Sequence, residues 1–364
     1  QNYIFFFSCK CILLFNWNTP NTYKKTFKKI KTNILFKLCI FAPNMRKRKT
    51  NNWHIPKGCE LTDFDKKILK LQDEGHLVPS RKLIKTPEQI EGIRQSGKIN
   101  TGVLDLIAQE IHAGMSTAEI DRLVYEFTTD HGAIPAPLNY EGFPKSVCTS
   151  INEVVCHGIP SEEDILEEGD ILNVDVSTIL NGFYSDASRM FIIGETSEEK
   201  KRLVKVAKEC LEVGAAAAKP WGYLGEIGKA ISHHAHKNGY SVVRELCGHG
   251  VGLDFHEDPE VDHYNTRKEG MLLVPGMVFT IEPMINMGRA DVEWLDDDWT
   301  VVTEDGSLSA HYENTILITQ VFQADRQHEQ DIIFTKFNTT RTLCNFFQDF
   351  QTCMNIIVED ILYI

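Results

Sequence analysis

The segment ILNVDVSTILNGFYSDAS, residues 171–188, has the apolar pattern of a buried sheet and a turn signal in its middle. That signal is Asn181-Gly182, because both central residues of a type I′ hairpin turn need positive φ. A two-residue turn at this point predicts a β-hairpin in which Leu180 lies opposite Phe183. The segment therefore predicts an antiparallel sheet built around this hairpin.

The same register places two carboxylates on one face of the hairpin. Asp186 pairs across with Ser177, and Asp175 lies two residues further along the partner strand, on the same face. Diagonal neighbours of this kind lie about 7–8 Å apart. Two carboxylates this close on a half-buried face repel each other and lose hydration, so a positive charge is expected between them. The hairpin is interpreted as half of a metal site.

The composition of the 364-residue chain, with 42% hydrophobic and 24% charged residues, is that of a soluble globular protein. Its length predicts one large domain or about two domains.

The charged residues are distributed unevenly along the chain. Residues 1–50 hold eleven Lys and Arg and no acid, which leaves 27 of the 38 basic residues against all 51 acidic ones, a net charge of −24. An acidic body of this kind argues against nucleic-acid binding.

The ten cysteines are scattered without paired spacing, so the sequence predicts neither a disulfide framework nor a zinc site of the CxxC type. This usage favours a reducing compartment, and we expect a cytoplasmic protein. No apolar run approaches the roughly 18 residues of a membrane span, so no membrane association is expected.

Both ends of the chain differ from the body in composition. Residues 1–44 are rich in Phe, Ile, Asn and Lys, and residues 321–364 lack glycine. Both are interpreted as non-native flanks, with Met45 as the start. A cleaved organelle-targeting segment is the alternative for the first flank. Residues 45–85 read as a polar N-terminal extension with a short helix near 63–72.

Capping boxes, in which Ser or Thr is followed three residues later by Glu or Gln, predict the starts of three helices. They are Thr86 with Gln89, Ser116 with Glu119, and Thr196 with Glu199. A fourth helix is expected over 224–239. Strands are expected within 147–158, 170–180, 182–193, 277–287, 299–312 and 313–319.

The second and fourth helices match at a fixed offset of 107 residues, at which Glu119 corresponds to Glu226 and Gly132 to Gly239. The match suggests that a unit of two helices and a following strand occurs twice. Two halves, about 86–193 and 194–320, would follow from this duplication, with a cleft between their sheets.

Three further polar residues interrupt apolar segments. Glu282 lies in GMVFTIEPMINM and Glu313 in SLSAHYENTILIT, while His249 lies between two glycines in a predicted loop. Each has a plain alternative reading, since a strand Glu often faces solvent or pairs with Arg, and a loop His often binds nothing. Buried carboxylates without partners are costly, so a shared cation would explain the whole set.

Together with the hairpin pair Asp175 and Asp186, these residues give four carboxylates and one imidazole. The four negative charges would be balanced by two divalent ions, and an oxygen-rich set with one nitrogen favours Co, Mn, Fe(II) or Zn. Two such ions a few ångströms apart lower the pKa of a shared water and polarise a carbonyl, as in two-metal hydrolysis.

The motifs SINEVVCHGIP, NVDVSTILNGFYSDAS, GHGVGLDFHEDP, FTIEPMIN and SLSAHYENT resemble those of the type I methionine aminopeptidases, a family of metallo-aminopeptidases. The resemblance covers about 86–319. Motif order and intervals also agree, with 11 residues from Asp175 to Asp186, 33 from His249 to Glu282 and 31 from Glu282 to Glu313. No room remains between His249 and Glu282 for the large insertion of the type II enzymes.

The resemblance implies an α+β pita-bread fold over 86–320, with two pseudo-symmetric αβ halves whose curved antiparallel sheets are flanked by helices. It also implies removal of the initiator methionine from nascent proteins with a small second residue, by two-metal hydrolysis of the first peptide bond. The implied partners are N-terminal Met peptides of nascent proteins and the ribosome, and the implied state is a monomer.

The resemblance further implies a role for each of the five residues. Asp186 and Glu313 would bridge two metal ions, His249 and Glu282 would complete one ion, and Asp175 would complete the other. Glu282 would also accept and donate the proton of the reaction. His256 would stabilise the oxyanion, and His157 would contact the substrate amide. The methionine pocket would be formed by Tyr140, Phe143, Cys148 and Trp299.

Four other readings are weighed against this one. A proline-directed aminopeptidase or dipeptidase of the same fold differs only in specificity, and a non-catalytic binding module would have lost ligands that are present here. The histidines of SHHAH, residues 232–236, could suggest a metal site. Their spacing places them on different faces of the predicted helix, so they are interpreted as the solvated end of a helix. No cysteine has the partner pattern of a nucleophile.

Overall fold

The computed structural model describes residues 53–55, 58–319 and 331–332 of the chain. The predictions made for the flank 1–44, and for all of 321–364 except 331–332, lie outside these residues. The helices of the described part are α2 (Asp63–Asp73), α3 (Pro87–Glu110), α4 (Thr117–Asp130), α5 (Glu198–Ala217) and α6 (Gly225–Lys237), with short 3₁₀ turns at Arg81–Leu83 and Tyr140–Gly142. None of these helices combines the length and apolarity that a membrane crossing requires.

The helix starts follow the capping signals, with one shift. The capping boxes of Thr86 and Ser116 are present at α3 and α4, as predicted. The third prediction was wrong by one residue, because the side chain of Ser197 caps α5. The hydroxyl of Thr196 instead donates a hydrogen bond to the carbonyl of Gly169 at 2.7 Å.

The strands of the described residues form one sheet of nine strands and two of three, and every pairing is antiparallel. The large sheet has the order β1-β4-β5-β14-β9-β7-β8, with β2 on β4 and β15 on β14. Its strands are β1 (Ile134–Pro135), β2 (Cys148–Ile151), β4 (Ile171–Leu180), β5 (Phe183–Ile192), β7 (Gly248–Gly250), β8 (Glu257–Val261), β9 (Val278–Ile281), β14 (Glu313–Leu317) and β15 (Asp331–Ile332).

The two smaller sheets have the orders β13-β10-β6 and β11-β12-β3. Their strands are β3 (Val154–Cys156), β6 (Ser241–Val242), β10 (Met284–Asn286), β11 (Val292–Trp294), β12 (Val301–Thr303) and β13 (Ser309–His311).

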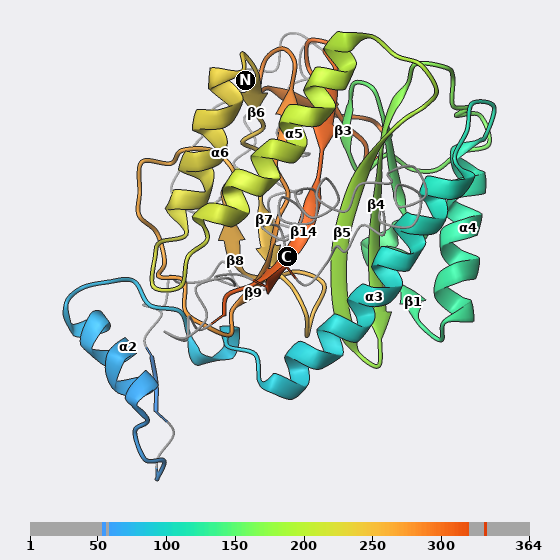
Figure 1. The fold of residues 1–364 in the computed structure, drawn as a ribbon. Helices are drawn as coiled ribbons and strands as arrows, with labels where there is room; N and C mark the ends of the chain where they lie inside the picture. Colours follow the sequence, from blue (N-terminus) through green and yellow to red (C-terminus); the bar gives the residue numbers. More distant parts are fainter. Residues whose placement is uncertain (1–52, 56–57, 320–330, 333–364) are drawn as a thin grey trace, which may run out of the picture. The chain divides into compact units, whose positions relative to one another are not determined.

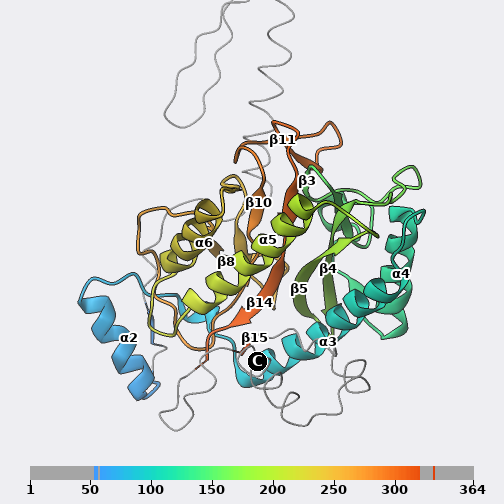
Figure 2. The ribbon, with the colours of Figure 1, turned by 45° about the horizontal axis from the view of Figure 1, so that its top comes forward.

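The pairing of β5 with β14 joins the two halves. Ser188 lies opposite Glu313 there, so the large sheet continues from the first half into the second. The strands expected in two sheets, one in each half, are therefore joined in a single large sheet. Figure 1 shows α3 and α4 beside β4 and β5, and Figure 2 shows α5 and α6 on the part that holds β8 and β14. Helices thus flank the sheet in both halves, as the α+β fold class predicts.

The offset of 107 residues extends beyond the two helices that suggested it. Gly132 and Gly239 both have positive φ, 71° and 85°, just after α4 and α6. The same offset carries β1 onto β6 and β4 onto the span of β9 and β10. It also carries Asp175 onto Glu282. The pseudo-symmetry of the predicted fold is confirmed, and it relates one predicted metal ligand to another.

The segment before α3 packs on the core of the second half. Trp53 and Ile68 are buried among the residues of α5 and α6. The indole N–H of Trp53 donates to Asp65 Oδ1 at 2.8 Å, and Arg81 binds the same oxygen at 3.0 Å. The apolar face of α2 is therefore part of the folded body.

Candidate metal centre

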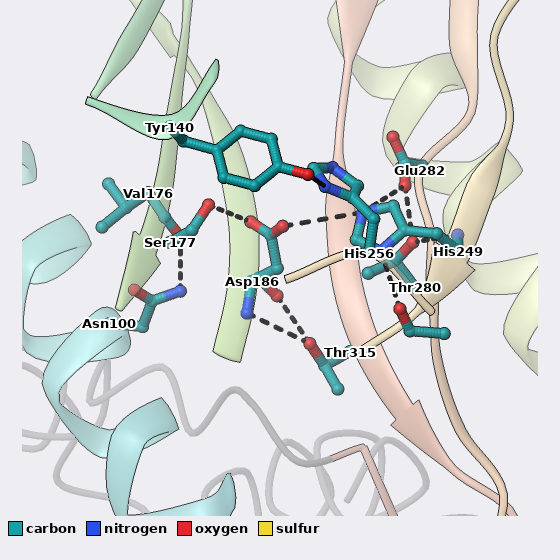
Figure 3. A network of polar contacts seen from close by, with 11 residues as sticks. Asn100, Tyr140, Val176, Ser177, Asp186, His249, His256, Thr280, Glu282 and Thr315 are labelled. Carbon is teal, nitrogen blue, oxygen red and sulfur yellow. Dashed lines mark hydrogen bonds and ion pairs between the residues drawn. The ribbon is translucent and has the colours of Figure 1, made fainter. Parts of the chain in front are cut away.

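The β4–β5 hairpin has the predicted register. Ser177 lies opposite Asp186, and its hydroxyl donates to Asp186 Oδ1 at 2.7 Å (Figure 3). The turn residues Asn181 and Gly182 have φ of 52° and 83°, as a type I′ turn requires. Asp175 lies on the same face of the hairpin, two residues along β4 from Ser177.

Strand β14 brings Glu313 beside this hairpin. Glu313 is its first residue and lies opposite Ser188 of β5. Further along β14, the hydroxyl of Thr315 donates to the backbone carbonyl of Asp186 at 2.8 Å (Figure 3). The strand pairing therefore fixes the distance between a carboxylate of the first half and one of the second.

His249 lies on strand β7, and the prediction that it lies in a loop was wrong. Its flanking glycines explain the strand. A β-carbon on Gly248 would lie 2.6 Å from the carbonyl oxygen of Thr280, and one on Gly250 would collide with that of Asp258. Residues without side chains let β7 fit closely between β8 and β9, and this packing holds the imidazole in place.

The imidazole of His249 presents one nitrogen to the carboxylates. Its Nδ1 donates to the carbonyl of Gly250 at 3.0 Å, so Nε2 carries the lone pair. Nε2 lies 3.7 Å from Asp186 Oδ2 and 3.6 Å from Glu282 Oε1. Burial lowers the pKa of His249 to about 4, which keeps the ring neutral near pH 7. A neutral ring fixed by a carbonyl is the usual form of a histidine ligand.

Glu282 lies in the break between β9 and β10, whereas a single strand was predicted there. Pro283 follows it and has no N–H for a ladder hydrogen bond, so the strand is interrupted. The backbone N–H of Glu282 donates to Nε2 of His263 at 3.0 Å, and the Thr280 hydroxyl donates to its Oε1 at 2.5 Å. Two neighbours that sequence analysis missed therefore hold Glu282: Thr280 orients its carboxylate, and His263 binds its backbone.

Burial raises the pKa of all four carboxyl groups. It raises the pKa of Asp175 to about 7 and that of Glu282 to about 8, and it also raises the pKa values of Asp186 and Glu313. Among the described residues, Asp175 Oδ1 and Glu313 Oε1 have no hydrogen-bond partner. Buried carboxylate oxygens without partners beside a neutral imidazole fit the coordination of divalent cations.

The ligand atoms form two compact groups that share Glu313. The first contains Asp186 and His249, and the second contains Glu282 and His311; within each group these atoms lie within 4.8 Å of one another. Asp175 is in neither group, but its carboxyl group is close enough to that of Glu313 for each to shift the pKa of the other. The structure thus brings the five predicted ligands together and adds His311.

Sequence analysis missed His311 although a signal was present. The residue lies two positions before Glu313 in SLSAHYENT, and residues two apart on an extended chain point to the same side. Its side chain is 2% exposed. A buried histidine next to a buried glutamate at this spacing would have qualified as a candidate on its own.

His256 and His157 lie near the carboxylates. Nδ1 of His256 is 2.9 Å from the Tyr140 hydroxyl, and its ring centroid is 4.3 Å from that of His249 (Figure 3). Burial lowers the pKa of His256 well below its ordinary value, so this ring is also neutral. His157 has φ of 57° and packs edge-on against Trp299 at 6.4 Å between ring centroids.

The residues predicted for the methionine pocket contact these histidines or one another. Phe143 packs edge-on against Trp299 with ring centroids 5.1 Å apart, and Tyr140 contacts the ring of His256. Cys148 is buried and lies opposite Asp175 in the β2–β4 pair. The structure therefore places Tyr140 beside His256, Trp299 between His157 and Phe143, and Cys148 beside Asp175.

The rejected candidates stay outside the centre. His233, His234 and His236 belong to neither ligand group, and Nε2 of His234 pairs with Glu209 at 2.8 Å. Burial raises the pKa of the thiols Cys148, Cys156 and Cys247, so they are protonated near pH 7 and unsuited to nucleophilic attack.

Comparison with known proteins agrees with this geometry. The model of metallopeptidase family M24 matches residues 91–320. Methionine aminopeptidase A of Synechocystis is 50% identical over 232 residues, which cover 64% of this chain and 92% of that protein. Methionine aminopeptidase of Escherichia coli K12 is 48% identical over 237 residues, which cover 65% and 90% of the two chains.

A solved structure is similar over the same region. The crystal structure of methionine aminopeptidase from Rickettsia prowazekii has a TM-score of 0.65 and 43% sequence identity, and the match covers 69% of this chain and 98% of that one. The pita-bread fold is thereby confirmed. The chain belongs to metallopeptidase family M24 and, within it, to the type I methionine aminopeptidases.

Proposed function

We propose that this chain removes the N-terminal methionine from nascent proteins whose second residue is small, by metal-dependent hydrolysis of the first peptide bond. One observation carries the proposal. Carboxylates from β4, β5 and β14, together with Glu282 and the imidazole of β7, lie buried in one cluster. The names of the similar proteins support the same activity.

We infer that two divalent ions, Co, Mn, Fe(II) or Zn, bind this cluster. Asp186 and Glu313 would bridge them, His249 and Glu282 would hold one, and Asp175 would hold the other. Such ions, when bound, polarise the substrate carbonyl and lower the pKa of water. Their charge balances the four carboxylates.

The protein's own groups would handle the proton and the developing charge. Glu282 has a carboxyl whose pKa burial raises to about 8, which suits a group that takes a proton and returns it near neutral pH. The pKa of Tyr140 is raised to about 12, so its hydroxyl keeps its proton and would donate a hydrogen bond to Nδ1 of His256. Nε2–H of His256 is then available to the oxyanion.

His157 and the aromatic residues would position the substrate. Nδ1 of His157 is buried without a hydrogen-bond partner among the described residues, so the ring can bind the amide of a substrate. Phe143, Trp299 and Tyr140 offer aromatic surface and Cys148 offers sulfur, which suit an unbranched thioether side chain.

Peptide kinetics test the specificity. The metal-loaded protein should cleave Met-Ala-Ser at a much higher kcat/KM than peptides that begin Xaa-Pro. A preference for the Xaa-Pro peptides would instead establish a proline-directed peptidase of this fold. A calorimetric titration that detects no uptake of Mn(II) by the wild-type protein would favour a non-catalytic binding module.

We further propose that the protein acts as a monomer on chains leaving the ribosome, in the cytoplasm. The cysteines of the described part support a reducing compartment, because Cys59, Cys148, Cys156, Cys210 and Cys247 are all free. Gel filtration and co-sedimentation with ribosomes test the oligomeric state and the association.

A further inference from the structure

The backbone of His311 is held firmly beside the centre. The residue ends β13 and lies opposite Met284 of β10. Its N–H donates to the sulfur of Met190 at 3.4 Å, and its carbonyl accepts a hydrogen bond from Nδ2 of Asn173 at 2.7 Å. These contacts use its backbone alone, so the polar atoms of the ring remain unused.

Both ring nitrogens of His311 are buried without a hydrogen-bond partner among the described residues. Three nearby buried or half-buried histidines differ, since His249, His256 and His263 each have a hydrogen bond at one ring nitrogen. A neutral imidazole has one donor and one acceptor, and buried polar atoms are almost always paired. The unpaired ring therefore indicates a partner that is not part of the protein chain.

The surroundings of the ring indicate what that partner is. One nitrogen of His311 lies within 4.8 Å of carboxylate oxygens of both Glu282 and Glu313. Ligand atoms around one ion at about 2.1 Å are at most about 4.2 Å apart, so a small rotation of these side chains closes the set around a cation. An imidazole and two carboxylates are a common set for a divalent transition metal.

We propose that His311 is a further metal ligand, which binds a divalent ion together with Glu282 and Glu313. The inference rests on the proposed function and deepens it, because it adds a second imidazole to the ion that Glu282 would hold with His249. His311 binds as a neutral ligand, so the charge balance between four carboxylates and two divalent ions is unchanged. Its nitrogen raises the affinity of the centre for Zn, Co and Fe(II) relative to Mg.

A crystal structure of the full chain loaded with Zn(II) tests the contact without any substitution. Anomalous scattering at the zinc edge locates the ions. We expect one ring nitrogen of His311 at about 2.1 Å from a zinc peak. A ring that lies more than about 3.5 Å from every peak would overturn the proposal.

Calorimetric titration with Mn(II) tests the contribution of the ligand in solution. His311→Gln keeps the size and hydrogen-bonding capacity of the side chain but removes the imidazole, and we expect the affinity for one ion to fall by about tenfold or more. The matched variant His256→Gln removes another imidazole near the same cluster and should bind both ions as the wild type does. Unchanged affinities in His311→Gln would refute this ligand while leaving the proposed function intact; a wild-type protein that binds no metal would refute both.

Discussion

Glu313 is the residue on which the centre depends most, because both groups of ligand atoms contain it. Replacing it with Gln removes its negative charge and exchanges one of its two carboxylate oxygens for an amide nitrogen, which is a poor metal ligand. We expect Glu313→Gln to lose turnover with the Met-Ala-Ser peptide and to lose the stabilisation by metal, which is about 2.7 kcal/mol at a hundredfold excess over Kd. Thermal unfolding with and without Mn(II) measures that increment.

The matched change lies two strands away on the same sheet, on β4. Ser177→Ala removes only the hydroxyl that donates to Asp186 Oδ1 and leaves every proposed ligand in place. This variant should keep most of the stabilisation by metal. An equal increment in Glu313→Gln and in the wild type would show that Glu313 is not a ligand.

His256 should affect the rate and not the metal. We expect His256→Ala to lower kcat about 10²- to 10³-fold, the typical cost of removing an oxyanion donor, with normal metal content. Tyr140→Phe removes the hydroxyl that contacts His256 Nδ1 and should have a smaller effect of the same kind. Single-turnover kinetics and metal analysis of the two variants measure both. Loss of metal from His256→Ala would make this residue a ligand.

At the residue scale, the candidate ligands were predictable because each is a polar group in an apolar segment. Asp175, Asp186 and Glu282 all interrupt strand patterns in this way. His311 and Thr280 were missed because a single His or Thr in a strand has many ordinary explanations. Only the three-dimensional contacts of their side chains distinguish these residues from others of their kind.

At the scale of elements, the loop that carries His256 is held by a buried ion pair. Lys85, just before α3, has a side chain that is 1% exposed, and its Nζ lies 2.5 Å from Glu257 Oε2. The other oxygen of Glu257 accepts hydrogen bonds from the backbone N–H groups of Leu253 and Asp254 at 2.7 and 3.1 Å. The pair thereby connects the start of α3 to the residues next to His256.

Breaking this pair should destabilise the protein and lower activity. We expect Lys85→Met to lower the free energy of unfolding by roughly 3 kcal/mol, because Glu257 is left as a largely buried charge without its partner. The control is Lys66→Met, whose pair with Asp63 is exposed and screened by water, so its loss should cost far less. Urea unfolding compares the two. Equal losses of unfolding free energy in the two variants would mean that burial does not strengthen the Lys85–Glu257 pair.

Local chemistry predicted the elements well where the signal was local. The turn at Asn181-Gly182 and the capping boxes at Thr86 and Ser116 depend on residues at most three positions apart. Prediction failed where distant contacts decide the result. Strand β7 exists because glycines let it approach its neighbours, and the β5–β14 pair joins segments more than a hundred residues apart.

At the scale of the whole molecule, the buried titratable groups predict how stability varies with pH when metal is absent. Above about pH 6.5 the unfolded chain has deprotonated its carboxyl groups and histidines. The folded protein keeps protons on buried carboxyls, since the pKa of Glu282 is raised to about 8 and that of Asp175 to about 7. The folded state therefore binds more protons than the unfolded state, and stability falls as pH rises through this range.

Below about pH 6.5 the buried histidines oppose this trend, because burial lowers the pKa values of His249 and His311 to about 4 and about 3. We therefore expect the free energy of unfolding in EDTA to fall between about pH 6.5 and 8, by about 1.4 kcal/mol per pH unit for each carboxyl that stays protonated. Urea unfolding at several pH values checks the slope. Saturating Mn(II) should abolish it, and a slope that persists with metal bound would place its origin elsewhere.

The packing of the elements into the whole molecule was harder to predict from the sequence than the elements themselves. The repeat suggested two halves, and the offset that joins Glu119 to Glu226 also relates Asp175 to Glu282. The packing of Trp53 and α2 on the second half was not foreseen, because their apolar residues are few and lie in a polar segment. Family resemblance supplied the fold, and the contacts at the seam of the sheet came only from the structure.

The pairing of β5 with β14 has a consequence for how the protein would behave after proteolysis. The proposed ligands come from both sides of the connection between β5 and α5, where Gly194 and Glu195 are exposed to proteases. A single cut there would leave two fragments, joined by the strand ladder and by ions shared between them. Such a nicked protein should remain one particle while divalent cations are present, and a chelator should allow the pieces to separate.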